Sequence, residues 1–149
     1  MRSGTVAATD TAVIVDASVV IKWYAAEGRE PHQREALEIL RRFTRGELAV
    51  HAPDLIRYEV GNALARAAPD PEAGYRSFLN LPIRFHHPDA SMLLRALECR
   101  RRRGGSVYDA VYGVLAETLG VPLVTTDAGQ ARRCGGGAVM LEVFAAESS

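Results

Sequence analysis

Short apolar runs, several of them β-branched, alternate along this chain with longer segments in which apolar residues recur every three or four positions. The first pattern is typical of buried strands and the second of amphipathic helices. The runs predict strands at Ala12–Asp16, Leu48–Ala52, Ile83–His86, Val121–Thr125 and Ala138–Val143. Because helices separate these strands, we expect a mainly parallel sheet covered on both faces, a three-layer α/β/α sandwich.

The segments between the strands carry local helix signals. Ser18 is the expected N-cap of a short helix, while Pro31 suits the first turn of another and Gly46 its end. Helices are predicted at Ser18–Ala25, Pro31–Thr44, Pro53–Ala68, Glu72–Leu79, Asp89–Arg103 and Ser106–Leu119, with a short segment at Ala128–Arg133. The helix at Ser106–Leu119 is apolar on most sides, so we expect it to be central.

Length and composition indicate one soluble domain. The chain has 149 residues, of which 48% are hydrophobic and 24% charged, and its net charge is zero. We expect residues 12–145 to form a single domain and residues 1–11 a flexible leader. Zero net charge means that any nucleic-acid site must be a local basic patch.

The expected location is the cytoplasm. No apolar stretch approaches the roughly 20 residues that span a membrane. Cys99 and Cys134 have no metal-ligand spacing, and the simplest interpretation is two free thiols in a reducing compartment.

Four acidic residues lie in stretches that otherwise avoid charge. Asp16 ends one strand run and Asp127 follows another, while Asp109 and Glu59 lie in apolar parts of their helices. Taken singly, each has an ordinary explanation as a cap, a turn former or a salt-bridge partner. Those explanations do not account for four acids that share an apolar context, because a buried carboxylate is costly unless it is paired, hydrogen-bonded or metal-bound.

The acids are expected to meet at one edge of the sheet. Ligands of open α/β sheets bind outside the carboxyl ends of the strands, where Asp16 and Asp127 would project. Asp109 falls in the first turn of its helix, where backbone N–H groups favour negative charge. Glu59 points inward at 100° per residue, with Asn62 and Arg66 further along the same line.

Four converging carboxylates would repel one another unless a cation lies between them. Mg²⁺ or Mn²⁺, hard and oxygen-seeking, suits such a site. A carboxylate-held divalent ion beside a phosphate implies phosphoryl chemistry. No Walker loop, dinucleotide fingerprint or serine-triad order in the sequence competes for that role.

With the acids placed, the chain resembles the PIN domain, and within it the VapC-like toxin ribonucleases. The resemblance extends from about Val13 to Val143 and occurs in the order of the family. The segments that carry it are Val15–Trp23, Tyr58–Leu64, Val107–Tyr112, Leu115–Glu117 and Pro122–Asp127. Any one of these segments is a weak signal, but their shared order is specific.

The resemblance implies a Mg²⁺-dependent endoribonuclease, the toxin of a type II toxin–antitoxin pair. Such proteins are often homodimers and are held inactive by a cognate antitoxin. By the same resemblance, Asp16, Glu59, Asp109 and Asp127 form the catalytic quartet that binds Mg²⁺ or Mn²⁺. Asp16 and Asp109 are expected to hold metal directly, and the other two to bind metal or orient water. Attack of metal-activated water on the RNA phosphodiester would leave a 5′-phosphate and a 3′-hydroxyl.

Further residues are expected at the RNA. Ser18 and Thr125 match hydroxyl positions that line the family's site, although cap and turn roles suit them equally well. Asn62 matches an amide near the glutamate. The predicted phosphate contacts are Arg66, Arg102 and Arg103, with Lys22, Arg132 and Arg133 in support. The run Arg100–Arg103 is also what a helix C-terminus favours, and both roles are compatible.

One departure from the family pattern and two rival interpretations stand beside this prediction. After Asp127 the family commonly has a basic residue and a leucine, whereas here Ala128, Gly129 and Gln130 follow. One rival is a non-catalytic PIN-like module that binds RNA or protein. The other is a small Mg²⁺-dependent phosphatase with Asp16 as nucleophile, which would want a second aspartate where Ser18 stands.

Overall fold

The computed structural model describes residues 11–133 and 137–147 of the chain. They form a five-stranded sheet in the order β3-β2-β1-β4-β5, and every pairing in it is parallel. The strands are β1 (Ala12–Val15), β2 (Ala49–Pro53), β3 (Arg84–His86), β4 (Leu123–Thr125) and β5 (Ala138–Met140). Most of the predicted leader, residues 1–10, and Cys134 lie outside the described residues.

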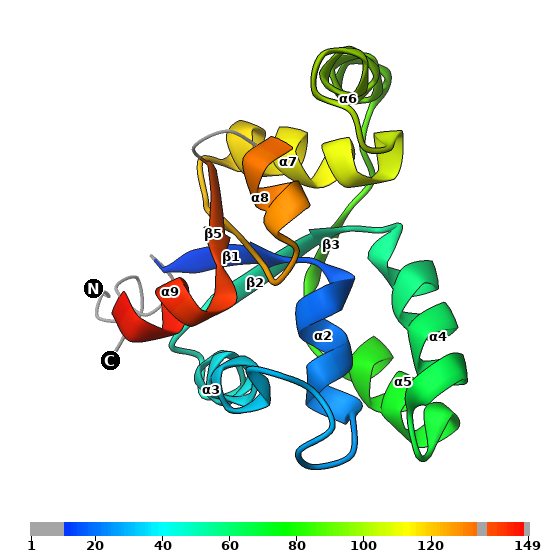
Figure 1. Ribbon diagram of the computed structural model, residues 1–149, viewed down its shortest axis with the longest axis vertical. Coiled ribbons are helices and arrows are strands. Elements are labelled where there is room, and N and C mark those ends of the chain that lie inside the picture. The colour runs from blue at the N-terminus through cyan, green and yellow to red at the C-terminus, as the bar shows by residue number, and fades with distance from the viewer. Residues whose placement is uncertain (1–10, 134–136, 148–149) are drawn as a thin grey trace, which may run out of the picture.

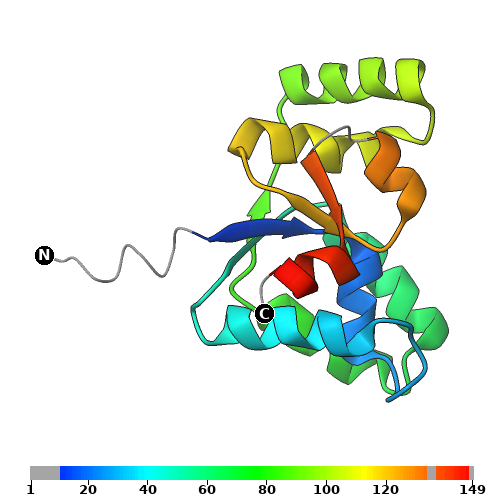
Figure 2. The same cartoon turned by 60° about the vertical axis from the view of Figure 1, so that its left-hand side comes forward.

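Helices cover both faces of this sheet, which confirms the predicted three-layer α/β/α sandwich (Figures 1 and 2). On one side α7 lies against the sheet, with α6 outside it and α8 beside it. On the other side lie α2, α3, α4 and α5. The helices are α2 (Ala17–Tyr24), α3 (Gln33–Thr44), α4 (Ile56–Ala67), α5 (Pro71–Asn80), α6 (Ala90–Arg103), α7 (Val107–Leu119), α8 (Ala128–Arg133) and α9 (Leu141–Glu147).

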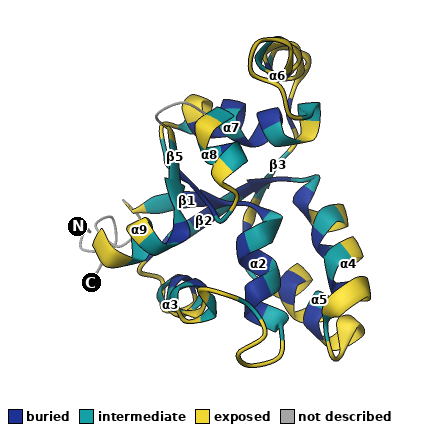
Figure 3. Ribbon diagram, viewed as in Figure 1, coloured by how far each residue is buried: buried dark blue, intermediate teal, exposed yellow. Residues whose placement is uncertain are grey.

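The apolar runs account for the centre of the fold. Val13, Ile14 and Val15 are 0% exposed because β1 is the middle strand and has helices on both faces. Such a strand reads as a continuous apolar run rather than an alternating one. Helix α7 is buried along most of its length, as its sequence predicts, whereas the described part of α6 buries only Ala96 (Figure 3).

Several predicted boundaries are wrong, two because of strand pairing and one because of a local backbone conformation. Pro53 does not open a helix: it is the last residue of β2, where it pairs with His86. Helix α3 begins at Gln33 and not at Pro31, because His32 has a left-handed backbone (φ 58°) that a helix cannot include. The last strand ends at Met140 because its partner β4 offers only three residues for pairing, and Leu141 already begins α9.

The part of the chain that the structure describes contains no helix long and apolar enough to cross a membrane.

Candidate active site

Asp16 lies at the carboxyl end of the central strand and begins α2. Its Oδ1 accepts hydrogen bonds from the Ser18 backbone N–H (3.1 Å) and from Ser18 Oγ (2.5 Å). Its Oδ2 accepts one from Thr125 Oγ1 (2.5 Å). Asp16 is therefore the N-cap of α2. The prediction that Ser18 caps this helix is wrong, because the carboxylate two residues earlier already accepts the free amide of Ser18.

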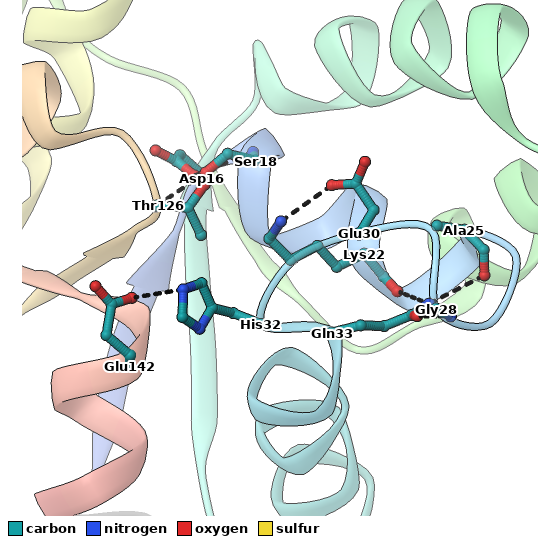
Figure 4. A network of polar contacts seen from close by, with 10 residues as sticks. All are labelled: Asp16, Ser18, Lys22, Ala25, Gly28, Glu30, His32, Gln33, Thr126 and Glu142. Atoms are coloured by element: carbon teal, nitrogen blue, oxygen red, sulfur yellow. Dashed lines mark hydrogen bonds and ion pairs between the residues drawn. The ribbon is translucent and has the colours of Figure 1, made fainter.

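Two hydroxyl groups join Asp16 to the loop that follows β4. Ser18 Oγ accepts a hydrogen bond from the Thr126 amide (3.2 Å), a link seen in Figure 4, and Thr125 Oγ1 accepts one from the Asp127 amide (3.0 Å). The strand register explains this proximity, because Val15 pairs with Val124 and the next residue of each strand is then adjacent. Ser18 and Thr125 thus position Asp16 through their hydroxyl groups.

The Asp16 carboxylate is 8% exposed, and its recorded partners are hydroxyls and backbone amides without a positive charge. Burial raises the pKa of Asp16 above its ordinary value, and the hydrogen bonds from Ser18 and Thr125 only partly oppose this. A buried carboxylate in this state is stabilised by any cation that approaches it.

Glu59 lies in the first turn of α4 and is hydrogen-bonded to Tyr112. Tyr112 Oη donates a hydrogen bond to Glu59 Oε1 at 2.6 Å. Burial raises the pKa of Glu59; the Tyr112 bond lowers it, and the charges of Asp16 and Asp109 raise it again. Asp16 and Asp109 therefore both lie within electrostatic reach of Glu59.

Asp109 lies in the first turn of α7, where the Ser106 hydroxyl caps the helix by accepting the Asp109 amide (3.1 Å). Its carboxylate is paired with a guanidinium: Arg133 Nη2 lies 3.4 Å from Asp109 Oδ2. Its carbonyl accepts a hydrogen bond from Gln130 Nε2 (2.8 Å). Both Gln130 and Arg133 belong to α8, so α8 fixes the surroundings of this acid.

Asp127 reaches the same edge, but its carboxylate is turned toward its own helix. Asp127 Oδ1 accepts the amides of Gly129 (2.8 Å) and Gln130 (3.2 Å) at the beginning of α8. The charges of Asp16 and Asp109 act on Glu59, while the predicted convergence of the acids on one ion stays a prediction. Asp127 is joined to Asp16 through the Thr125 hydroxyl.

The donor chemistry of this edge suits a hard divalent ion, since carboxylate oxygens are what Mg²⁺ and Mn²⁺ prefer. The mutual repulsion felt by Glu59 is what a cation among these acids would relieve. Within residues 11–133 and 137–147, however, no three acidic, histidine or cysteine side chains are arranged so that they could hold a metal. In this arrangement the carboxylates of Asp16, Asp109 and Asp127 each engage hydrogen-bond donors of the protein itself.

Comparison with known proteins agrees with this geometry. Residues 13–136 match the PIN domain family. This chain belongs to the PIN domain family. It is 30% identical over 126 residues to ribonuclease VapC3 of Pyrobaculum aerophilum, a match that covers 77% of this chain and 88% of that protein. It is therefore a VapC ribonuclease homologue.

Solved structures share the fold of this PIN domain. A Pyrobaculum aerophilum protein superposes with a TM-score of 0.65 at 25% identity, over 92% of this chain and 96% of that one. A toxin–antitoxin complex from Klebsiella pneumoniae superposes with a TM-score of 0.64 at 17% identity, over 87% of this chain and 97% of that one.

The residues predicted to contact RNA are spread around the PIN-domain site. Asn62 and Arg66 are exposed on α4, beyond Glu59. Arg102 Nε is paired with Glu98 Oε2 (3.2 Å), and Arg103 Nη1 donates to the Arg133 carbonyl (2.9 Å). A cavity of about 250 Å³ lies among these arginines; its lining includes Arg95, Glu98, Cys99, Arg102, Glu117 and Arg133.

One predicted phosphate contact is wrong. Lys22 is 3% exposed, and its Nζ is paired with Glu30 Oε1 at 3.0 Å, so it cannot reach a phosphate at the surface (Figure 4). Its neighbour Trp23 is a core residue, and its Nε1 donates to the Ala36 carbonyl (2.8 Å).

Two contributors to the site escaped the sequence analysis. Tyr112 follows Asp109 by three residues on one helix and therefore shares its face, a signal that could have been read. Gln130 gave no such signal, because its contact with Asp109 depends on how α8 packs on α7.

Proposed function

We propose that this VapC homologue is a Mg²⁺- or Mn²⁺-dependent endoribonuclease that acts as the toxin of a toxin–antitoxin pair. The observation that carries the proposal is the placement of Asp16 and Asp109 near the half-buried Glu59. They lie at the carboxyl edge of the sheet, close enough that the charges of Asp16 and Asp109 raise the pKa of Glu59. A cation is the missing partner of such a group.

The protein side chains divide the work as follows. Asp16 and Asp109 would hold the ion directly, while Glu59 and Asp127 would bind it or orient a water molecule. Ser18 and Thr125 keep Asp16 aimed at the site through their hydrogen bonds. When bound, the ion would activate water and stabilise the leaving oxygen of the phosphodiester.

The substrate in this proposal is the RNA backbone near the arginines of α6. Arg102, Arg103 and the more distant Arg66 would contact phosphates, and Asn62 would contact the nucleotide next to Glu59. Phosphate contacts position a strand without reading its sequence. Replacing one of these arginines by glutamine should weaken RNA binding and lower its salt dependence by about one phosphate contact.

The proposed partners are a cognate antitoxin and a second copy of the chain. We place the protein in the cytoplasm, without association with a membrane. The Klebsiella pneumoniae neighbour is described as a toxin–antitoxin complex, which supports the first partner. Leu93, Leu94 and Leu97 are exposed on α6 and offer apolar surface that an association could bury. Light scattering of the purified chain, alone and with its antitoxin, measures both associations.

One observation favours a second candidate, a PIN-like module that binds RNA or protein without cleaving. Among the described residues no three metal-ligating side chains stand ready to hold an ion. Under this alternative the acids would remain bonded to Ser18, Thr125 and Arg133 in the working protein.

The test is cleavage of a mixed RNA pool by the purified protein with Mg²⁺ or Mn²⁺. Cuts should disappear with EDTA and in Asp109→Asn, and should persist in Glu72→Gln, a matched change of an exposed acid on α5. Asp109→Asn should stay folded or melt higher, because it removes one of the repelling charges. Metal binding without cleavage by antitoxin-free protein, on every RNA offered, would favour the binding module.

A further inference from the structure

Arg133 is the one described cation paired with an acid of the proposed quartet. Its Nη2 lies 3.4 Å from Asp109 Oδ2, with the two side chains 27% and 41% exposed. Its Nε is buried without a hydrogen-bond partner among the described residues. A surface ion pair of this kind is worth little stability by itself, so its position matters more than its strength.

The backbone makes room for this guanidinium. A Cβ at Gly105 would stand 2.5 Å from Arg133 Nε, and one at Gly129 would stand 2.9 Å from Arg133 Nη1. A side chain at either position would require the guanidinium to shift from its place beside Asp109. The Cβ at Gly129 would also lie 3.1 Å from Asp127 Oδ1, so the guanidinium stands close to Asp127 as well as to Asp109.

Contacts at the other end of the residue hold it there. The Arg133 carbonyl accepts a hydrogen bond from Arg103 Nη1 (2.9 Å) and contacts Cys99 Sγ (4.0 Å), both on α6. The Gln130 side chain fastens the same helix, α8, to the Asp109 carbonyl. Arg133 is therefore placed beside Asp109 by three helices and is not a side chain swinging freely in solvent.

We propose that Arg133 is a resident counter-ion that competes with the divalent metal for Asp109. This inference rests on the proposed function, because it needs the acids to be a metal site. With the guanidinium in place, Asp109 offers the metal a carboxylate that is already paired. A divalent ion must displace Arg133 or bind against its repulsion, which at a separation of about 6 Å in water amounts to about tenfold in affinity.

The ion pair engages one Asp109 oxygen with α8, and the described residues hold no group of three ligating side chains ready for a metal. Once displaced, Arg133 would remain beside the arginine-lined cavity that it shares with Arg95, Glu98 and Arg102. Metal loading would in this way add a positive charge to the surface that faces the RNA phosphates.

The experiment is calorimetric titration of Mn²⁺ into the wild-type protein and into Arg133→Gln, without RNA. Arg133→Gln should bind Mn²⁺ about tenfold more tightly, and high salt should narrow the difference. Arg132→Gln, a change of the exposed neighbouring arginine, should bind like wild type. Equal or weaker Mn²⁺ binding by a folded Arg133→Gln would overturn the proposal, as would the absence of Mn²⁺ binding by both proteins.

A second readout follows the arginine itself. The ¹⁵Nε signal of Arg133, identified by its loss in Arg133→Gln, should shift when Mg²⁺ is added. A signal that stays in place while the metal binds would overturn the proposal even if affinities differ. RNA cleavage is assayed separately. If the wild-type protein cleaves no RNA but the difference in Mn²⁺ affinity is found, the proposed role of Arg133 is supported and the proposed ribonuclease activity is contradicted.

Discussion

Two buried charged residues at opposite ends of one short helix have different kinds of partner. Asp16 begins α2 and Lys22 lies near its end, and they are 8% and 3% exposed. Lys22 finds an opposite charge, Glu30, at 3.0 Å. Asp16 finds hydroxyls and amides, and burial raises its pKa. Figure 4 shows both residues, with Glu30 above the lysine and Ser18 beside the aspartate.

The difference separates structural charges from functional ones. A buried charge with an opposite charge in contact is compensated and needs nothing further from solution. A buried carboxylate that accepts hydrogen bonds from hydroxyl groups has a fixed orientation, but its charge is only partly compensated. A bound cation would therefore still stabilise it. If burial alone indicated a functional charge, Lys22 would be a stronger candidate than Asp16. The nature of the partner reverses that order.

The largest expected effect is on cleavage in Asp16→Asn. We expect the rate to fall by at least about a thousandfold, because a neutral amide is a far poorer ligand for a divalent ion. The melting temperature should be unchanged or higher, since asparagine still caps α2 and a desolvated charge is gone. RNA cleavage and thermal melting on the same sample check both statements. A folded Asp16→Asn variant that cleaves RNA normally would contradict the functional role given to Asp16 in this comparison.

Lys22→Met should have the opposite pattern, with lower stability and unchanged cleavage. We expect a loss of about 1–2 kcal/mol of unfolding free energy, because Glu30 loses its partner but is exposed enough to be rehydrated. Cleavage should stay at the wild-type level. Urea unfolding of Lys22→Met, Glu30→Gln and the double variant measures the coupling between the two charges. Normal stability with reduced cleavage would return Lys22 to the RNA surface.

A smaller effect is expected from Tyr112→Phe, which removes the hydrogen bond to Glu59. That bond lowers the pKa of Glu59, so its loss should raise this pKa further and move the acidic limb of the pH–rate profile upward. The rate at neutral pH should fall about threefold to tenfold. Tyr108→Phe, a change at an exposed tyrosine of the same helix, is the matched control. Identical pH profiles for the two variants would remove Tyr112 from the site.

The smallest effect is the pH dependence of stability. Burial raises the pKa of Glu59 above its ordinary value of 4.5, so the folded state holds this proton more tightly than the unfolded chain. The resulting stabilisation is complete below that value and is lost as the pH rises through the raised one. Without metal, Glu59→Gln should therefore become more stable relative to wild type as the pH rises above the ordinary pKa of glutamate toward neutrality. Denaturant unfolding across this range checks the sign, and saturating Mg²⁺ should reverse it.

Local patterns account for much of this molecule. The run that becomes β1 has the composition of a strand covered on both faces, and α7 has that of a helix packed between two layers. Boundaries failed where a distant residue decided them. Pro53 ends a strand because His86 pairs with it, and β5 stops where β4 stops. Pairing partners of this kind are set by packing and cannot be read from one segment.

The sequence by itself determined which residue types could form the site and at which strand ends they would project. Asp16, Asp109 and Asp127 follow from strand ends and helix starts, because these periodicities and capping rules are local. Only the tertiary structure decided what each charge touches. It paired Lys22 with Glu30, placed Tyr112 against Glu59 and seated Arg133 on Asp109. The energy of a buried charge depends on its neighbours within a few ångströms, and in a folded chain many of those neighbours are distant in sequence.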